Sequence, residues 1–304
     1  MPDFSPNQNS TASVLNATSN DALSRRDAPA FVALMYHNIF SDPSAYRDLS
    51  PSATSYFVSS EAFEAQLKAI KNCGGACISW DAIEAFYRPG NTSNYPNSSN
   101  GFPVLLTFDD GWSGAVEIGG PILVEHCAQA LLFVTTDFIN RPYMLSRAEL
   151  SRIDPAIFHI GSHARTHRML SLLNSREIRA ELEDSRKLLE DIVGYKIESL
   201  SIPSGAVNAR VRKIAAECGF RFVFDSEPRV NRRGSSSLAI GRVAITGDTS
   251  LTTFRNSVRQ RLTRQRLRRA VLEGPKRVLG LRRYESMRRW LLRESPGQQV
   301  THES

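Results

Sequence analysis

Short apolar segments alternate with amphipathic segments along this chain, and this alternation limits the possible folds more than any other feature. The apolar segments end in polar residues and are short enough to be buried strands; they are residues 31–36, 76–79, 103–108, 130–135, 158–162, 199–202, 221–224 and 238–245. Apolar spacings of three and four predict helices over residues 60–72, 81–88, 114–127, 175–193 and 207–218. Such alternation predicts an α/β fold of parallel βαβ units. Apart from the short segment 76–79, these are seven strands, and this number favours a barrel over an open sheet.

The positive charge is concentrated near the C-terminal end. The 304-residue chain has a formal charge of +7, whereas residues 255–293 hold 14 Lys and Arg and only two Glu, a local charge of +12. We predict two helices here, over 254–272 and 276–291. Their arginine-rich faces fit either a solvated surface or contact with an anionic membrane or a lipid-linked substrate. No motif for nucleic acid is recognisable, so we do not expect a nucleic-acid partner.

Composition and segment lengths suggest the domain limits and the compartment. Residues 1–29 are polar and rich in Ser and Asn, and we expect a flexible tail without the basic start and apolar core of a signal peptide. We expect a catalytic barrel over 30–250 and an Arg-rich helical extension over 251–304. Four cysteines are too few for a disulfide scaffold of this length. We therefore expect a cytoplasmic protein that could lie peripherally at the inner membrane surface.

Two adjacent carboxylates follow the predicted strand at 103–108. In parallel α/β folds, functional residues gather at the C-terminal ends of strands. Asp109 and Asp110 stand at such an end, and Gly111 permits a sharp turn after them. Paired carboxylates there suit a division of labour, in which one binds a metal and the other moves a proton. Two loop aspartates that cap the next helix are the structural alternative.

Two of the six histidines follow the strand at 158–162. His163 and His167 are four residues apart, and in a helical turn this spacing places both imidazoles on one face, where they can bind one cation. Two imidazoles and one carboxylate leave open metal positions for water and substrate, which is typical of a catalytic site. The ligand set fits zinc hydrolysis and also ferrous oxygenase chemistry. A second carboxylate beside the metal favours hydrolysis.

A third strand end carries the turn Pro203-Ser204-Gly205. Backbone N–H groups exposed in such a turn can bind an oxyanion. The segments VLLTFDDGWSG, IGSHARTHRML and this turn, in this order, resemble the NodB-homology polysaccharide deacetylases of carbohydrate esterase family four. The resemblance runs from about residue 31 to about residue 246.

The resemblance implies a distorted (β/α)7-type barrel, here followed by the basic helical extension. It also implies one divalent metal ion, with zinc expected. By position, Asp109 would be the general base, while Asp110, His163 and His167 would hold the metal. The backbone N–H of Ser204, flanked by Pro203 and Gly205 in the substrate-binding turn, would stabilise the oxyanion.

Two positions depart from the usual family pattern. The arginine that normally precedes the turn falls at Ser201, and the late histidine that normally supplies the general acid is absent. The segment LMYHNI resembles the branch of exopolysaccharide and poly-N-acetylglucosamine deacetylases with an early Tyr-His pair, and we expect His37 to act as the acid. EPRVNRRGSSSLAIGRV resembles a late segment of the same branch. We assign its Arg242 to the substrate pocket, as a partner that lowers the pKa of Asp109.

These motifs predict a metal-dependent hydrolase that removes N-acetyl groups from an amino-sugar-containing glycan or glycolipid precursor. Trp112 follows the aspartates, and its indole could stack on the sugar or pack on the next helix. Two other functions remain open. A degenerate homologue would bind glycan without hydrolysis, and a sister enzyme would deformylate an N-formyl sugar.

Overall fold

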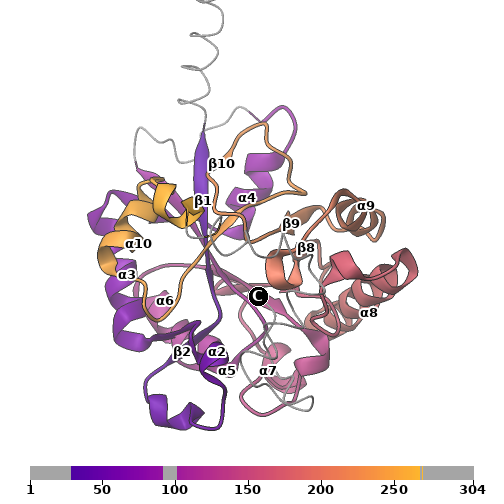
Figure 1. The fold of residues 1–304 in the computed structure, drawn as a ribbon, viewed down its shortest axis with the longest axis horizontal. Helices are drawn as coiled ribbons and strands as arrows, with labels where there is room; N and C mark the ends of the chain where they lie inside the picture. The colour runs from indigo at the N-terminus through magenta and orange to yellow at the C-terminus, as the bar shows by residue number, and fades with distance from the viewer. Residues whose placement is uncertain (1–28, 92–100, 268, 270–304) are drawn as a thin grey trace, which may run out of the picture.

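The computed structural model describes residues 29–91, 101–267 and 269. Its centre is a curled sheet of parallel strands (Figure 1). Neighbouring strands pair in the order β1 (Ala30–Tyr36), β5 (Phe102–Phe108), β6 (Ala130–Val134), β7 (Phe158–Ser162), β8 (Ser199–Ser201) and β9 (Phe222–Phe224). A last parallel strand, β11 (Arg242–Ala244), returns to pair with β1.

The sheet closes through the residues just before β11. Phe224 forms a parallel bridge with Ile240, and the N–H of Ile240 donates to the carbonyl of Val223 at 2.8 Å. The hydrogen bonds therefore lead from β1 through β9 and β11 back to β1, and the predicted distorted (β/α)-type barrel is confirmed. The predicted strand at 238–245 is shorter than expected, because only Arg242–Ala244 pairs along β1.

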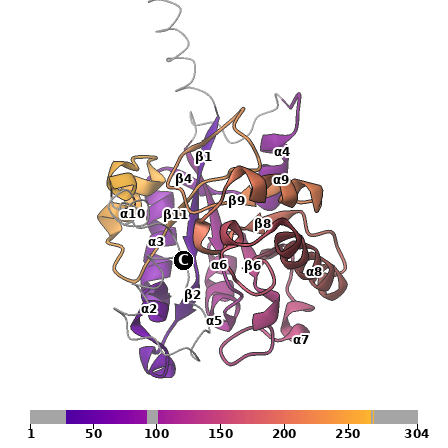
Figure 2. The ribbon, with the colours of Figure 1, turned by 45° about the vertical axis from the view of Figure 1, so that its right-hand side comes forward.

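Helices cover the outside of the barrel. Figures 1 and 2 show α3 (Ser60–Asn72) and α10 (Leu251–Val258) on one side and α8 (Ser175–Val193) and α9 (Ala209–Glu217) on the other. Shorter helices are α2 (Pro51–Thr54), α4 (Trp80–Tyr87), α5 (Ser113–Glu117), α6 (Gly119–Glu125) and α7 (Arg147–Leu150), with 3-10 turns η1 (Pro43–Tyr46), η3 (Thr136–Phe138), η4 (Leu170–Leu172) and η5 (Pro203–Gly205).

Four short strands complete the structure. Strands β2 (Asn38–Phe40) and β3 (Phe57–Ser59) pair with each other beyond the end of β1. Strand β4 (Gly75–Cys77) pairs in parallel with β5, and β10 (Asn231–Arg232) pairs antiparallel with β1. The segment 246–249 lies beside the residues that connect α2 to β3, because the N–H of Gly247 donates to the carbonyl of Ser55 at 3.0 Å. These additions surround the barrel without interrupting its parallel strands.

Two predicted helices differ from the structure. The segment 114–127 forms α5 and α6 with a break at Ile118, because Gly119 and Gly120 favour helix poorly and Pro121 cannot donate a helical hydrogen bond. The segment 254–272 begins earlier, in α10, and is interrupted after Val258 by Gln260 with φ of 60°. The predicted helix at 276–291 and residues 1–28 of the expected tail lie outside the described residues. Among those described, no helix is both long and apolar enough to span a membrane.

The alternation of side chains along each strand separates two cores. One fills the barrel interior and includes Ala33, Leu105, Phe133 and Phe224, all buried. A larger core lies between the strands and the surrounding helices. In β5, the interior positions continue from Leu105 through Thr107 to Asp109, so the strand that fills the interior also delivers a carboxylate to the C-terminal mouth.

Candidate active site

The mouth of the barrel brings three potential metal ligands together. Asp110 follows β5, whereas His163 and His167 follow β7. One Asp110 oxygen, Oδ1, lies 3.4 Å from Nε2 of His163 and 3.4 Å from Nε2 of His167. All three ligand atoms lie within 4.8 Å of one another. Among the described residues, this Oδ1 is buried and has no hydrogen-bond partner.

The two histidines meet through a loop rather than through the expected helical turn. Ala164 and His167 both have positive φ, 60° and 61°, so the chain between the imidazoles is not helical. The ring centroids nevertheless lie 4.9 Å apart. Asp110 also has a positive φ, 75°, directly before Gly111 at 92°. Such backbone conformations are unfavourable for side-chain-bearing residues and are common at functional sites.

His163 and Asp110 are each oriented by a hydrogen bond with a neighbouring group. The Nδ1–H of His163 donates to the carbonyl of Ser201 at 2.9 Å, because a carbonyl can only accept, and this leaves Nε2 as the available ligand atom. Burial lowers the pKa of His163 to about 3, so its imidazole is neutral over the physiological range. The indole Nε1–H of Trp112 donates to Asp110 Oδ2 at 3.1 Å, which leaves Oδ1 toward the histidines.

The position of Trp112 corrects its expected contact with the sugar. The side chain is only 1% exposed and packs in the cluster of Phe57, Phe138 and Met144. It therefore presents no ring face to a substrate. The sequence left open stacking on the sugar and packing on the next helix. The structure instead packs the indole against Phe57, Phe138 and Met144, where it also orients Asp110.

The loop between the histidines is held by Glu181 of α8. The Glu181 carboxylate is 5% exposed and accepts hydrogen bonds from the N–H groups of Arg165 at 3.1 Å and Thr166 at 2.8 Å. The hydroxyl of Thr166 donates to the same carboxylate. Three donors from the His163–His167 loop thus converge on one side chain. Glu181 therefore positions the loop that carries both histidines of the candidate metal site.

Replacing Glu181 with glutamine is expected to weaken metal binding by about tenfold or more, because the amide has only one oxygen to accept these bonds. Zinc affinity measured by competition with a chromophoric chelator tests this. Glu183→Gln is the matched control, since Glu183 lies on the same helix with its side chain 54% exposed. Equal zinc affinity in wild type and Glu181→Gln, with both folded, would contradict the role.

Asp109 is held beside the three ligands by a buried arginine. Arg242 of β11 is fully buried, and its Nη1 and Nη2 donate to Asp109 Oδ1 at 2.7 Å and Oδ2 at 2.8 Å. Nη1 also donates to Thr107 Oγ1 at 3.1 Å and Nη2 to Ser201 Oγ at 2.7 Å. Ser201 in turn donates to Asp109 Oδ2 at 3.1 Å. The arginine that holds the Asp109 carboxylate thus comes from β11. At position 201 of β8, where the family usually has this arginine, Ser201 contributes only a hydroxyl to Asp109.

This pairing sets the charge of Asp109. Burial alone would raise the pKa of the carboxyl, but the charge and hydrogen bonds of Arg242 outweigh burial and hold the pKa well below its usual range. Burial raises the pKa of Asp110, whose carboxylate has no such arginine partner. The expected pairing of Arg242 with Asp109 is therefore present. Its expected place in the substrate pocket is corrected, because a fully buried side chain does not contact substrate.

His37 lies at the end of β1, on the same mouth. It is 7% exposed, and its ring lies 4.6 Å from that of Tyr56. Burial lowers the pKa of His37, while the charges of Asp110 and Asp109 oppose this effect. Its buried Nδ1 has no hydrogen-bond partner among the described residues. The imidazole is thus an electrostatic neighbour of both carboxylates and carries a polar atom available to a ligand.

The turn after β8 lies beside these groups, because Ser201 contacts both Asp109 and His163. Ser204 has φ of 59°, and the N–H of Gly205 donates to the carbonyl of Ile202 at 3.0 Å. A Cβ at position 205 would lie 2.5 Å from Ser226 Oγ, so this turn requires glycine. The turn that carries the Ser204 N–H therefore lies next to the carboxylate of Asp109 and the ring of His163.

The residues present fit a divalent cation. A buried carboxylate oxygen without a hydrogen-bond partner faces the Nε2 atoms of two imidazoles, and such a set suits a cation at its centre. Asp110, His163 and His167 would hold the ion. Bound there, it would supply Lewis-acid chemistry, lowering the pKa of water and polarising a carbonyl group.

Sequence reasoning did not identify Glu181 or Ser201 as part of the site. A signal for Glu181 exists, because it falls on the buried stripe of α8 between Ile178 and Leu182, where a carboxylate needs partners. Ser201 has no comparable signal, because its contacts depend on how β8 and β11 are placed in three dimensions.

Comparison with known proteins finds relatives over the central part of the chain. Residues 97–223 match the family model described as polysaccharide deacetylase. A Bacillus subtilis protein named as a polysaccharide deacetylase, YxkH, is 26% identical over 151 residues, which are 50% of this chain and 54% of that protein. Chitin deacetylase 1 of Cryptococcus neoformans is 32% identical over 115 residues, 38% of this chain and 23% of that protein. The matched segments thus span about half of the first relative and about a quarter of the second.

Solved structures share the fold over a longer stretch. The Streptococcus pyogenes deacetylase PplD superposes with a TM-score of 0.64 and 21% identity, over 76% of this chain and 99% of the other. IcaB from Ammonifex degensii gives a TM-score of 0.64 and 22% identity, over 75% and 97%. At these identities the likeness shows the fold, in agreement with the barrel described above.

Proposed function

The chain belongs to the NodB-homology polysaccharide deacetylase family, as its motifs predicted, and we propose that it is a divalent-metal-dependent hydrolase that removes N-acetyl groups from an amino-sugar-containing glycan or glycolipid precursor. The observation that carries this proposal is the carboxylate of Asp109 beside the three ligands. Asp109 Oδ2 lies 3.8 Å from Nε2 of His163. A protein that only bound a glycan would have no need for a second buried carboxylate held ionised at this position.

The residues divide the work of amide hydrolysis. Two imidazoles and one carboxylate are usual ligands of catalytic zinc, and we expect zinc at Asp110, His163 and His167. Asp109 takes a proton from the water that attacks the acetyl carbonyl, and Arg242 keeps the carboxylate ionised and oriented. The N–H of Ser204 donates to the oxygen that gains negative charge. The carbon–nitrogen bond then breaks to yield acetate and an amine.

His37 is proposed to protonate the leaving amine. Because burial lowers the pKa of this imidazole, its protonated form gives up a proton readily. The contact with Tyr56 fixes the plane of the ring at the mouth. No other histidine in the described residues, apart from the two metal ligands, lies at the C-terminal ends of the barrel strands.

The zinc-loaded protein is expected to release acetate from oligomers of N-acetylglucosamine, and His37→Gln is expected to lower kcat by about a hundredfold or more with KM little changed. Acetate is measured with a coupled enzyme assay. His126→Gln is the control, since His126 lies at the end of α6 and outside the site.

The alternatives give other results in the same assay. Formate released from an N-formyl sugar, without acetate from the acetylated one, would establish the deformylase. Zinc binding with release of neither acid would favour a glycan-binding homologue. An effect of His37→Gln on KM alone would make His37 a binding residue.

A further inference from the structure

Helix α10 and the residues after it carry positive charge without any acidic residue. Residues 251–267 contain five arginines and neither Asp nor Glu. Helix α10 buries Phe254, Ser257 and Val258, whereas all five arginines are exposed. They are Arg255, Arg259, Arg261, Arg264 and Arg266. We refer to the exposed side of residues 251–267 as the basic surface.

The charge of the basic surface is not neutralised by neighbouring carboxylates. Elsewhere, exposed arginines pair with acidic residues, as Arg147 does with Asp191 at 2.6 Å. None of the five arginines of the basic surface forms an ion pair with another described residue. Arg264 donates to a hydroxyl instead, and Arg266 donates to a backbone carbonyl. The basic surface therefore attracts an anionic partner.

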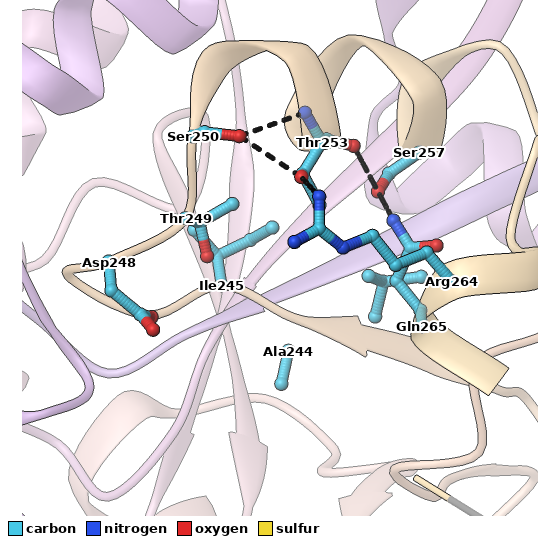
Figure 3. A pocket seen from close by; sticks show the side chains of 10 residues that line it. Ala244, Ile245, Asp248, Thr249, Ser250, Thr253, Ser257, Arg264 and Gln265 are labelled. Carbon is cyan, nitrogen blue, oxygen red and sulfur yellow. Dashed lines mark hydrogen bonds between the residues drawn. The ribbon is translucent and has the colours of Figure 1, made fainter. Parts of the chain in front are cut away.

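The two parts of the basic surface are held together. Residues 263–267 are helical and lie against α10 (Figure 3). Arg264 Nη1 donates to Thr253 Oγ1 at 3.3 Å, and Gln265 Nε2 donates to Ser257 Oγ at 2.6 Å. A surface that is already ordered in this way loses less conformational freedom when it binds a partner.

Large apolar side chains are exposed on the same surface. Leu251 is 39% exposed and Leu267 is 66% exposed. They are two of the three large hydrophobic residues that are exposed in the described part of the chain, and the third, Val124, lies on α6. A nucleic acid or an anionic glycan would bind the arginines but leave the leucines in water. The interface of an anionic bilayer accommodates both kinds of side chain.

We propose that the basic surface docks the protein peripherally on anionic lipid membranes. The guanidinium groups contact lipid phosphates, while Leu251 and Leu267 enter the boundary between headgroups and acyl chains. A glycolipid precursor, one of the two substrates proposed above, would lie in such a membrane. Docking itself does not require hydrolysis, so it can be tested separately from the proposed function.

Flotation of the full chain with lipid vesicles tests the proposal. We expect binding to vesicles made of equal parts phosphatidylglycerol and phosphatidylcholine, and little binding to phosphatidylcholine alone. Removing three exposed arginines of the basic surface is expected to weaken binding to the anionic vesicles about a hundredfold. This variant is Arg255→Gln/Arg259→Gln/Arg261→Gln. The control removes three arginines that are exposed elsewhere, in Arg147→Gln/Arg176→Gln/Arg221→Gln.

A second variant distinguishes a lipid surface from a soluble polyanion. Leu251→Ala/Leu267→Ala keeps every arginine but removes the exposed apolar groups, and it is expected to bind the anionic vesicles about tenfold more weakly. Val124→Ala is the matched control, because Val124 is also exposed but lies on α6. It should bind as the wild type does.

Equal flotation with neutral and anionic vesicles, or none with either, would overturn the proposal. So would a folded arginine variant that binds as its control does, since another part of the chain would then be responsible. A leucine variant that binds as Val124→Ala does would reject the lipid surface in favour of a soluble polyanion. Vesicle binding that depends on both sets of residues, without acetate release, would support docking and reject the proposed hydrolysis.

Discussion

Replacing Asp110 and His163 together by alanine is expected to abolish metal binding and hydrolysis. Elemental analysis of the wild type should find about one divalent metal per chain, because the three ligand atoms converge on one point. The double variant should retain none, and turnover should fall at least about a thousandfold, since the ion would supply several kcal/mol of transition-state stabilisation. The control is Asp191→Ala/His126→Ala, which removes the same residue types outside the site.

This loss should not come from unfolding. Burial raises the pKa of Asp110, so the metal-free folded protein gains no stability from ionising this carboxylate. In the presence of a chelator, the melting temperature of the double variant is therefore expected to lie at most a few degrees below that of the wild type. In the presence of zinc, only the wild type should gain stability.

The opposite result would change the interpretation of the whole mouth. If wild-type protein bound no metal after incubation with zinc, cobalt or nickel, the three ligands would be structural remnants of the family fold. The glycan-binding alternative would then be favoured.

The position of the site could be predicted because strand ends are visible in the sequence. Asp109, Asp110 and His163 each follow an apolar run, and parallel strands bring such ends to one edge. The alternation of side chains along β5 also determines which residues face inward. Leu105 and Asp109 are an even number of positions apart and therefore face the same side. Arg242 was identified through the resemblance of its segment to a late segment of one family branch, whereas its full burial was not predicted.

What could not be predicted depends on local backbone geometry and on packing between distant segments. The positive φ of Ala164 and His167 replaces the helical turn that the four-residue spacing suggested. The burial of Trp112 depends on Phe57 and Met144, which are far from it in sequence. No residue pattern along the chain encodes such contacts. The break of the helix at Ile118 was foreseeable, because Gly119, Gly120 and Pro121 follow it.

Replacing Arg242 with methionine is expected to destabilise the protein by about 3–5 kcal/mol near neutral pH, because it leaves the Asp109 carboxylate buried without its partner. Urea unfolding in the presence of a chelator measures this loss. Arg242→Lys keeps the charge but loses the paired hydrogen bonds, so its stability should lie between that of the wild type and that of Arg242→Met. Arg147→Met is a surface control with little expected effect, since Arg147 and its partner Asp191 are both more than half exposed.

The pH dependence of this loss distinguishes an unpaired charge from lost packing. In wild type the folded pKa of Asp109 lies below its unfolded value of about 3.9, so the pair stabilises fully above that value and its contribution is lost as the pH falls through the folded pKa. In Arg242→Met, burial without the guanidinium should raise the folded pKa above the unfolded one. The stability that protonated Asp109 contributes in the variant is then present below the unfolded pKa and is lost as the pH rises through the folded pKa. The stability difference between wild type and variant should therefore be smaller at about pH 5 than at about pH 7, whereas a difference independent of pH would assign the loss to packing alone.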